Sequence, residues 1–93
     1  MPTRAVHVTI SGRVQGVWFR GWTVKEAKVR RLTGWVRNRR DGSVEAVFQG
    51  EAEDVRSMLK ACDQGPMMAK VESIRITDTE IMDFTEFRKL PTA

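Results

Sequence analysis

The chain has 93 residues and a formal net charge of +4 at pH 7, which is enough length for one small domain with a single hydrophobic core. Its lone cysteine, Cys62, excludes an internal disulfide, and its lone histidine, His7, lacks the partners of a zinc site or of a Ser-His or Cys-His catalytic pair. No apolar run approaches the roughly 20 residues of a membrane helix, and the N-terminus lacks an apolar signal core. We therefore expect one cytoplasmic domain, residues 1–93 with its core at about 5–88, and no membrane partner.

The spacing of apolar residues predicts the elements of the first half. Alternation predicts a strand over residues 5–12, and residues 20–31 have the spacing of a helix. Two further strands are predicted over residues 33–39 and 43–49. They meet at Asp41-Gly42, a dipeptide typical of a β-hairpin turn because glycine accepts positive φ.

The second half continues with a helix and a strand. Acidic residues open the helix, and its apolar stripe consists of Val55, Met58, Leu59 and Cys62. Cys62 is therefore expected to be a buried, inert thiol. The helix ends at Gly65-Pro66, and a strand is predicted over residues 71–77. Residues 84–87 are the candidate for a short additional edge strand, and the chain from Pro91 onward is expected to fray.

The order β-α-β-β-α-β indicates an α+β fold of the ferredoxin-like type. In this arrangement two helices cover one face of a four-stranded antiparallel sheet, with the short fifth strand at an edge. Alternation along the second strand places Val36 and Asn38 on one face and Trp35 and Arg37 on the other. His7 is expected on a strand face of the first strand.

The segment from Gly12 to Arg20 joins the first strand to the first helix and has the features of an anion site. Such a loop points backbone N–H groups outward, and the following helix adds its positive N-terminal end. Arg20 adds a guanidinium whose planar fork matches phosphate oxygens. An ordinary turn with a solvated arginine fits the spacing as well. The Gly-Lys-Ser/Thr of a nucleotide P-loop and the G-x-G-x-x-G spacing are both absent.

Two ordered motifs resemble the acylphosphatase family over roughly residues 5–88. The first is Gly-Arg-Val-Gln-Gly-Val at residues 12–17, followed by two residues and Arg20. The second is Gly-Trp-Val-Arg-Asn at residues 34–38, followed by Asp-Gly-Ser-Val-Glu at residues 41–45. The resemblance implies a ferredoxin-like fold and a metal-independent hydrolase that cleaves the carboxyl-phosphate bond of acyl phosphates, with no cofactor.

The resemblance also implies roles for individual residues. Arg20 would bind the phosphate and Asn38 would hold the attacking water, so these two are the candidate catalytic residues. Backbone amides of the loop would complete the phosphate site, and these belong to Gln15, Gly16, Val17, Trp18, Phe19 and Arg20. The three tryptophans, Trp18, Trp22 and Trp35, are expected to pack in the core or against the loop.

The chain departs from the family pattern at two positions. Arg31 falls where a helix-ending glycine is usual, so it is expected to adopt a left-handed conformation at a cost near 1 kcal/mol. Arg39 follows Asn38 where threonine is more familiar, and it is expected to add charge near the site.

Positive charge is concentrated in the half that contains the loop. Residues 1–40 hold ten lysines and arginines and one acid, and residues 41–93 hold six basic and eleven acidic side chains, so the halves carry +9 and −5. A positive half attracts anionic ligands. We expect a monomer whose partners are an acyl phosphate and the product, inorganic phosphate. Nucleic acid is not expected, because the aromatic signature of a βαββαβ RNA-binding module is absent. A module that senses a phosphorylated ligand without turnover remains the other alternative.

Overall fold

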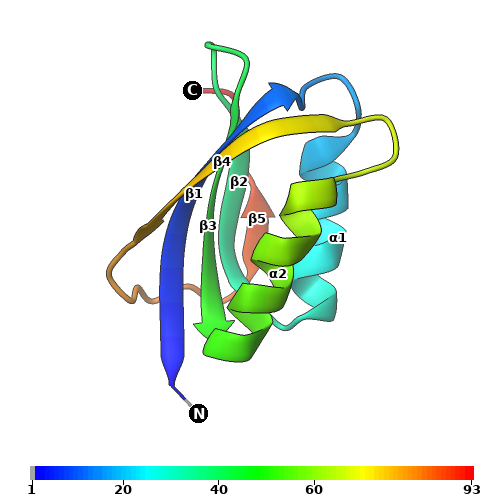
Figure 1. Ribbon diagram of the computed structural model, residues 1–93. Coiled ribbons are helices and arrows are strands. Elements are labelled where there is room, and N and C mark those ends of the chain that lie inside the picture. Colours follow the sequence, from blue (N-terminus) through cyan, green and yellow to red (C-terminus); the bar gives the residue numbers. More distant parts are fainter. Residues whose placement is uncertain (1) are drawn as a thin grey trace.

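The computed structural model describes residues 2–93 and shows two layers, a five-stranded sheet and two helices that both lie on one of its faces (Figure 1). The strands lie side by side in the order β4-β1-β3-β2-β5. The predicted β-α-β-β-α-β order and the ferredoxin-like arrangement are confirmed. In chain order the elements are β1 (Thr3–Arg13), α1 (Phe19–Val29), β2 (Thr33–Asn38), β3 (Val44–Glu51), α2 (Ala52–Gln64), β4 (Lys70–Asp78) and β5 (Phe87–Lys89).

The fifth strand lies farther along the chain than the sequence predicted. It occupies Phe87–Lys89 and pairs in parallel with β2, so that the sheet is mixed. Phe87 sets this position because its ring is buried and stacks on Phe48, with ring centroids 5.5 Å apart. The expected fraying after Pro91 is wrong as well. The Ala93 N–H donates to the Asn38 carbonyl at 3.0 Å, and the Ala93 carbonyl accepts from the Arg40 N–H at 2.9 Å.

The core lies between the sheet and the helices, and alternation along the strands decides which residues enter it. Helix α1 contributes its buried residues Phe19, Thr23 and Ala27. Three residues of the predicted stripe of α2 are buried, and burial raises the pKa of the Cys62 thiol to about 12, as expected for an inert cysteine. The inward-facing strand residues are fully buried; they are Val6, Val8, Ile10, Val36, Val44, Ala46 and Phe48. Within residues 2–93 no helix has the length and apolar character to cross a membrane.

The end of α1 confirms the conformation that was expected of Arg31. The Leu32 N–H donates to the Ala27 carbonyl at 2.9 Å, and the Arg31 N–H donates to the Lys28 carbonyl at 3.0 Å. These two bonds form the Schellman motif, in which the residue after the helix is left-handed and usually glycine. Here that residue is Arg31, with φ of 58°. Buried Leu32 is the hydrophobic residue that accompanies the motif.

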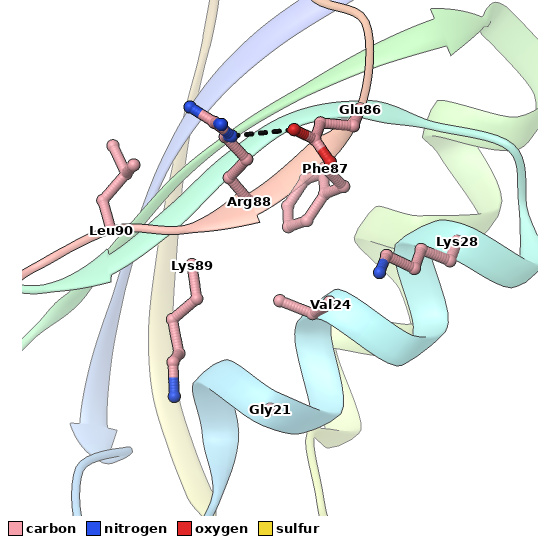
Figure 2. A pocket seen from close by; sticks show the side chains of 8 residues that line it. All are labelled: Gly21, Val24, Lys28, Glu86, Phe87, Arg88, Lys89 and Leu90. Atoms are coloured by element: carbon pink, nitrogen blue, oxygen red, sulfur yellow. Dashed lines mark hydrogen bonds and ion pairs between the residues drawn. The ribbon is translucent and has the colours of Figure 1, made fainter.

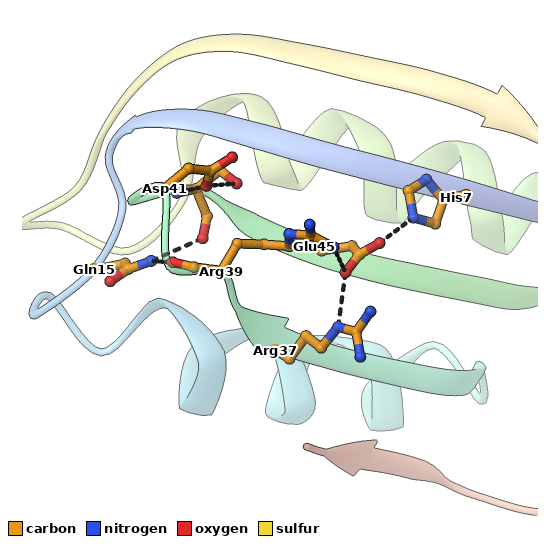
Figure 3. Close-up of polar contacts among 7 residues, drawn as sticks. His7, Gln15, Arg37, Arg39, Asp41 and Glu45 are labelled. Atoms are coloured by element: carbon orange, nitrogen blue, oxygen red, sulfur yellow. Dashed lines mark hydrogen bonds and ion pairs between the residues drawn. The ribbon is translucent and has the colours of Figure 1, made fainter. Parts of the chain in front are cut away.

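The face of the sheet without helices carries an ion-pair network centred on Glu45 (Figure 3). The Glu45 carboxylate accepts hydrogen bonds from Arg37 Nε at 2.7 Å, from Arg39 Nη1 at 3.1 Å and from His7 Nε2 at 2.6 Å. His7 therefore lies on a strand face, as predicted. Arg39, which was expected to add charge near the site, instead directs its guanidinium to this face. The Arg37 guanidinium also lies 4.8 Å from the centre of the Trp35 ring.

The network holds Glu45 ionised although its side chain is nearly buried. Burial acts to raise the pKa of the Glu45 carboxyl, but the hydrogen bonds from His7, Arg37 and Arg39 outweigh it and lower the pKa from 4.5 to about 2. Because the pKa is lower in the folded state, the network stabilises the fold above the ordinary pKa. That stabilisation is lost as the pH falls toward 2.

Replacing Arg31 with glycine should stabilise the protein. Glycine adopts positive φ without the steric cost of a Cβ, so we expect Arg31→Gly to raise the free energy of unfolding by up to about 1 kcal/mol in urea titrations. Arg31→Ala removes the same long side chain but keeps the Cβ, and it should give no gain. Equal effects of the two variants would show that the side chain, and not the backbone, is responsible.

Replacing Glu45 with glutamine should change how the free energy of unfolding depends on pH in the acidic range. We expect Glu45→Gln to lower the free energy of unfolding at pH 7 by about 3 kcal/mol, since a shift of one pKa unit corresponds to about 1.4 kcal/mol. The loss of stability of the wild type between about pH 5 and pH 2 should become shallower in the variant. Denaturant titrations across this range test it. Glu72→Gln, on the exposed surface of β4, is the control and should leave this dependence unchanged.

Candidate active site

The loop between β1 and α1 is fixed at both ends by buried side chains. Val14 and Phe19 are each 1% exposed, and the four residues between them span the gap at the surface. Gly16 and Trp18 adopt left-handed backbone conformations, with φ of 74° and 67°, and Val17 between them does not. Changes of handedness at successive residues turn neighbouring N–H groups toward one side, and such concave backbones bind anions.

The first turn of α1 adds further unpaired donors to this loop. Trp18 is the residue that precedes the helix, and no side chain caps the helix start. The first helical N–H bond joins the Trp22 N–H to the Trp18 carbonyl at 3.0 Å. The N–H groups of the residues before it have no intrahelical partner, as at every helix start, and the helix dipole makes this end positive. The first turn also contains no acidic side chain that would compete with an anion.

A cavity of about 140 Å³ lies between this loop and the end of β2. It brings together nearly all of the residues that the sequence singled out. Of the predicted phosphate-binding residues only Val17 does not line it, because the Val17 side chain packs against the core. The lining residues are Val14, Gln15, Gly16, Trp18, Phe19, Arg20, Gly21, Asn38 and Lys89.

Asn38 reaches the cavity because it is the last residue of β2 and lies on the helix side of the sheet. Val36, two residues earlier on the same face, is fully buried, so the alternation that the sequence predicted is observed. The Asn38 Oδ1 atom is buried and has no hydrogen-bond partner among residues 2–93. A buried amide oxygen without a partner costs about 1–3 kcal/mol, so this atom calls for a ligand or a water molecule.

The side chain of Gln15 ties the loop to the hairpin that follows Asn38. Gln15 Nε2 donates to the Arg39 carbonyl at 2.7 Å and to the Ser43 carbonyl at 2.8 Å (Figure 3). The hairpin turn is itself held by Asp41, whose carboxylate accepts from the Ser43 hydroxyl at 2.6 Å and from the Ser43 N–H at 2.9 Å. These bonds lower the pKa of Asp41. The two halves of the cavity are thus fixed relative to each other by polar contacts.

Two cationic side chains line the cavity, and the sequence analysis identified only one of them. Arg20 was predicted, and no carboxylate among the described residues lies within ion-pair distance of it. Lys89 was missed because the predicted last strand ended at Phe87, two residues before the observed end. Residues two apart in a strand lie on the same face, so a strand that contains buried Phe87 places Lys89 on the same face of β5. This alternation is the signal that could have identified Lys89.

The three tryptophans differ in their surroundings. Trp22 packs edge-on against Phe19, with ring centroids 5.4 Å apart, as expected. Trp35 lies half-buried on the open face of the sheet. Trp18 is 62% exposed, so of the two expected positions, in the core or against the loop, it does not occupy the core. Its indole lies against Gly21, where any added Cβ would overlap the ring. The left-handed backbone at Trp18 leaves this side chain on the outside of the loop.

The cavity offers hydrogen-bond donors and positive charge, and its lining has no group commonly used as a general base. None of the described residues that line it is a histidine, cysteine, aspartate or glutamate. Within residues 2–93 there is also no cluster of three such side chains that could hold a metal ion. The arrangement therefore suits the binding of a small anion by backbone N–H groups and two cations, beside an amide that can hold a water molecule.

Comparisons with known proteins identify the family of this chain. A family model described as Acylphosphatase matches residues 6–89. An acylphosphatase of Rhodospirillum rubrum is 52% identical over 85 residues, which cover 91% of this chain and 93% of that protein. An acylphosphatase of Rhizorhabdus wittichii is 48% identical over 89 residues, with 96% and 88% covered.

The fold leads to the same family. The solved structure of an acylphosphatase from Coxiella burnetii superimposes with a TM-score of 0.92 at 36% identity, covering 95% of this chain and 93% of that one. The resemblance seen in the two sequence motifs is thus confirmed over most of the chain. The chain belongs to the acylphosphatase family, and it is an enzyme that hydrolyses acyl phosphates.

Proposed function

We propose that the cavity holds the phosphoryl group of the acyl phosphate in the backbone loop and against Arg20, and that Asn38 positions the attacking water. The observation that carries this proposal is the unpartnered Asn38 Oδ1 beside the uncapped start of α1. An acceptor that lacks a donor and a set of donors that lack acceptors line one small cavity. A phosphoryl group and one water molecule satisfy both.

Arg20 and the N–H groups of residues 15–20 supply binding and charge stabilisation. Phosphoryl transfer passes through a loose transition state, in which positioning and electrostatic stabilisation do most of the work. The guanidinium is always charged and donates two parallel hydrogen bonds to phosphate oxygens. The fixed N–H groups need no rearrangement as negative charge develops on those oxygens.

Asn38 orients the nucleophile. The water molecule donates one hydrogen to Asn38 Oδ1, which leaves an oxygen lone pair free to attack phosphorus in line with the departing carboxylate. The bond from the water oxygen to phosphorus forms while the bond from phosphorus to the acyl oxygen breaks, and the electron pair of that bond leaves with the carboxylate. The proton of the water passes to a phosphate oxygen of the substrate or to solvent, because no lining side chain is available as a base.

The absence of carboxylate, histidine and cysteine side chains from the described lining fits the chemistry. A carboxylic acid has a pKa of about 4, so the carboxylate leaves without being protonated and no general acid is required. The inorganic phosphate product should bind the same loop and compete with substrate. We expect the rate to be independent of metal ions, and treatment with a chelator should leave it unchanged.

We further propose that the enzyme acts as a monomer. The edge strand β4 carries charged residues at Lys70, Glu72, Arg75 and Asp78, and charge along an edge discourages pairing with a second sheet. The other edge strand, β5, has only three residues. Sedimentation velocity at micromolar concentration should give the mass of one chain, 10.6 kDa. A cytoplasmic location stays a prediction from the sequence.

Two substitutions should separate binding from positioning. Arg20→Ala removes charge-assisted bonds to the phosphate, so kcat/KM for benzoyl phosphate should fall by about 100- to 1000-fold and inhibition by inorganic phosphate should weaken strongly. Asn38→Ala removes the amide that accepts from the water but no charged group, so kcat should fall about 100-fold while the inhibition constant of phosphate stays within a factor of about two.

Arg40→Ala serves as the control for a general loss of positive charge. Arg40 belongs to the adjacent hairpin but does not line the cavity, so this variant should keep nearly the wild-type rate. Near wild-type rates for Arg20→Ala and Asn38→Ala would contradict the assigned roles. A phosphate affinity lost equally in both variants would contradict the division of labour between them.

A further inference from the structure

A second, larger depression adjoins the phosphate cavity and contains two lysines that form no ion pair within residues 2–93. Its volume is about 580 Å³, and it runs between α1 and β5 (Figure 2). Gly21 and Lys89 line both this groove and the phosphate cavity. A ligand whose phosphoryl group occupies the cavity therefore continues into the groove past these two residues. We infer that the groove receives the acyl group and favours acyl phosphates whose acyl group carries a second negative charge.

Gly21 lies where the two spaces adjoin, and its lack of a side chain leaves room for a neighbouring ring. A Cβ at Gly21 would overlap the indole of Trp18, which lies against this residue. Trp18 lines the phosphate cavity and not the groove. The exposed indole thus forms one boundary of the cavity, and Lys89 lies where the cavity and the groove adjoin.

The charges in the groove are predominantly positive. Among the described residues, Glu86 is the only acid that lines it, and Arg88 Nε binds the Glu86 carboxylate at 2.9 Å. Lys28 and Lys89 form no ion pair within residues 2–93, and they leave the groove with two uncompensated ammonium groups. An acyl group with a carboxylate or a second phosphate would supply the missing negative charge.

The two ammonium groups are placed at different distances from the phosphate. Figure 2 shows Lys89 pointing from β5 toward the first turn of α1 at Gly21, and Lys28 reaching back along α1 toward Val24. Lys28 is seven residues after Gly21, a rise of about 10 Å along a helix, and its side chain shortens that distance by leaning toward the helix N-terminus. This separation suits an acyl group with a few carbon atoms between its two anionic ends.

The preference is measured with two synthetic substrates that differ in one charge. The probes are 4-carboxybenzoyl phosphate and 4-isopropylbenzoyl phosphate, which have similar shapes and a rigid ring. The quantity of interest is the ratio of their kcat/KM values. The wild type should favour the carboxylate substrate at low ionic strength, and the ratio should fall as salt screens the lysines.

Lys28→Met should lower this ratio about three- to fivefold, the size expected for one partly exposed ion pair. Lys89→Met should lower it to a similar extent, and it should also reduce kcat/KM for both substrates because Lys89 touches the phosphate cavity. Lys25→Met is the matched control. Lys25 lies exposed on the same helix outside the groove, so its loss changes the net charge equally but should leave the ratio unchanged.

The inference rests on the proposed function, and the same assays distinguish the two failures. A wild type that hydrolyses neither probe would contradict the proposed function. A wild type that hydrolyses both probes with a ratio near one would overturn the inference alone. So would a ratio that Lys28→Met leaves unchanged, or that Lys25→Met lowers as much as Lys28→Met does. Thermal unfolding of each variant verifies that it is folded at the assay temperature.

Discussion

The site depends on the two hydrogen bonds that the side chain of Gln15 donates to the carbonyls of Arg39 and Ser43. The phosphate loop belongs to the β1–α1 connection, and Asn38 belongs to β2, so the chain itself does not hold them at a fixed distance. Gln15 joins the loop directly to the hairpin that follows Asn38. An in-line attack requires the water molecule and the phosphoryl group to be placed within a fraction of an ångström. These two bonds therefore set the geometry on which the proposed reaction depends.

The positively charged side chains near the site are divided between the two faces of the sheet. On the open face the Glu45 carboxylate accepts hydrogen bonds from the guanidinium groups of Arg37 and Arg39, which precede and follow Asn38 in the sequence. Alternation along β2 sends these side chains away from the cavity and Asn38 into it. Two positive charges that could have competed for the phosphate are thereby held on the open face by one carboxylate, and they brace the strand end that carries Asn38. Arg20 and Lys89 then remain as the cations of the cavity.

Much of the fold and most of the cavity lining could be predicted from the sequence, because they follow from local patterns. Alternation is enough to put Asn38 on the helix side of β2, and the motif around Arg20 locates the loop. The position of β5 could not be read in the same way, since Phe84 and Phe87 are both apolar and only packing against Phe48 selects the second. Lys89 was missed with it. The Gln15 side chain joins the loop to the hairpin through contacts with residues 24 and 28 positions away in the sequence. No local pattern encodes such contacts.

Two residues of this chain carry the same backbone strain for different reasons. Trp18 and Arg31 both have φ near 60°, a conformation that costs a residue with a Cβ roughly 1 kcal/mol or more. At Trp18 the strained backbone forms part of the anion loop, and the indole that it places outside covers Gly21 at the border of the cavity. Glycine there would relieve the strain and remove the wall. Arg31 merely ends α1 in a Schellman motif whose bonds glycine would make equally well. Strain is therefore tied to the proposed chemistry at the first position and is dispensable at the second.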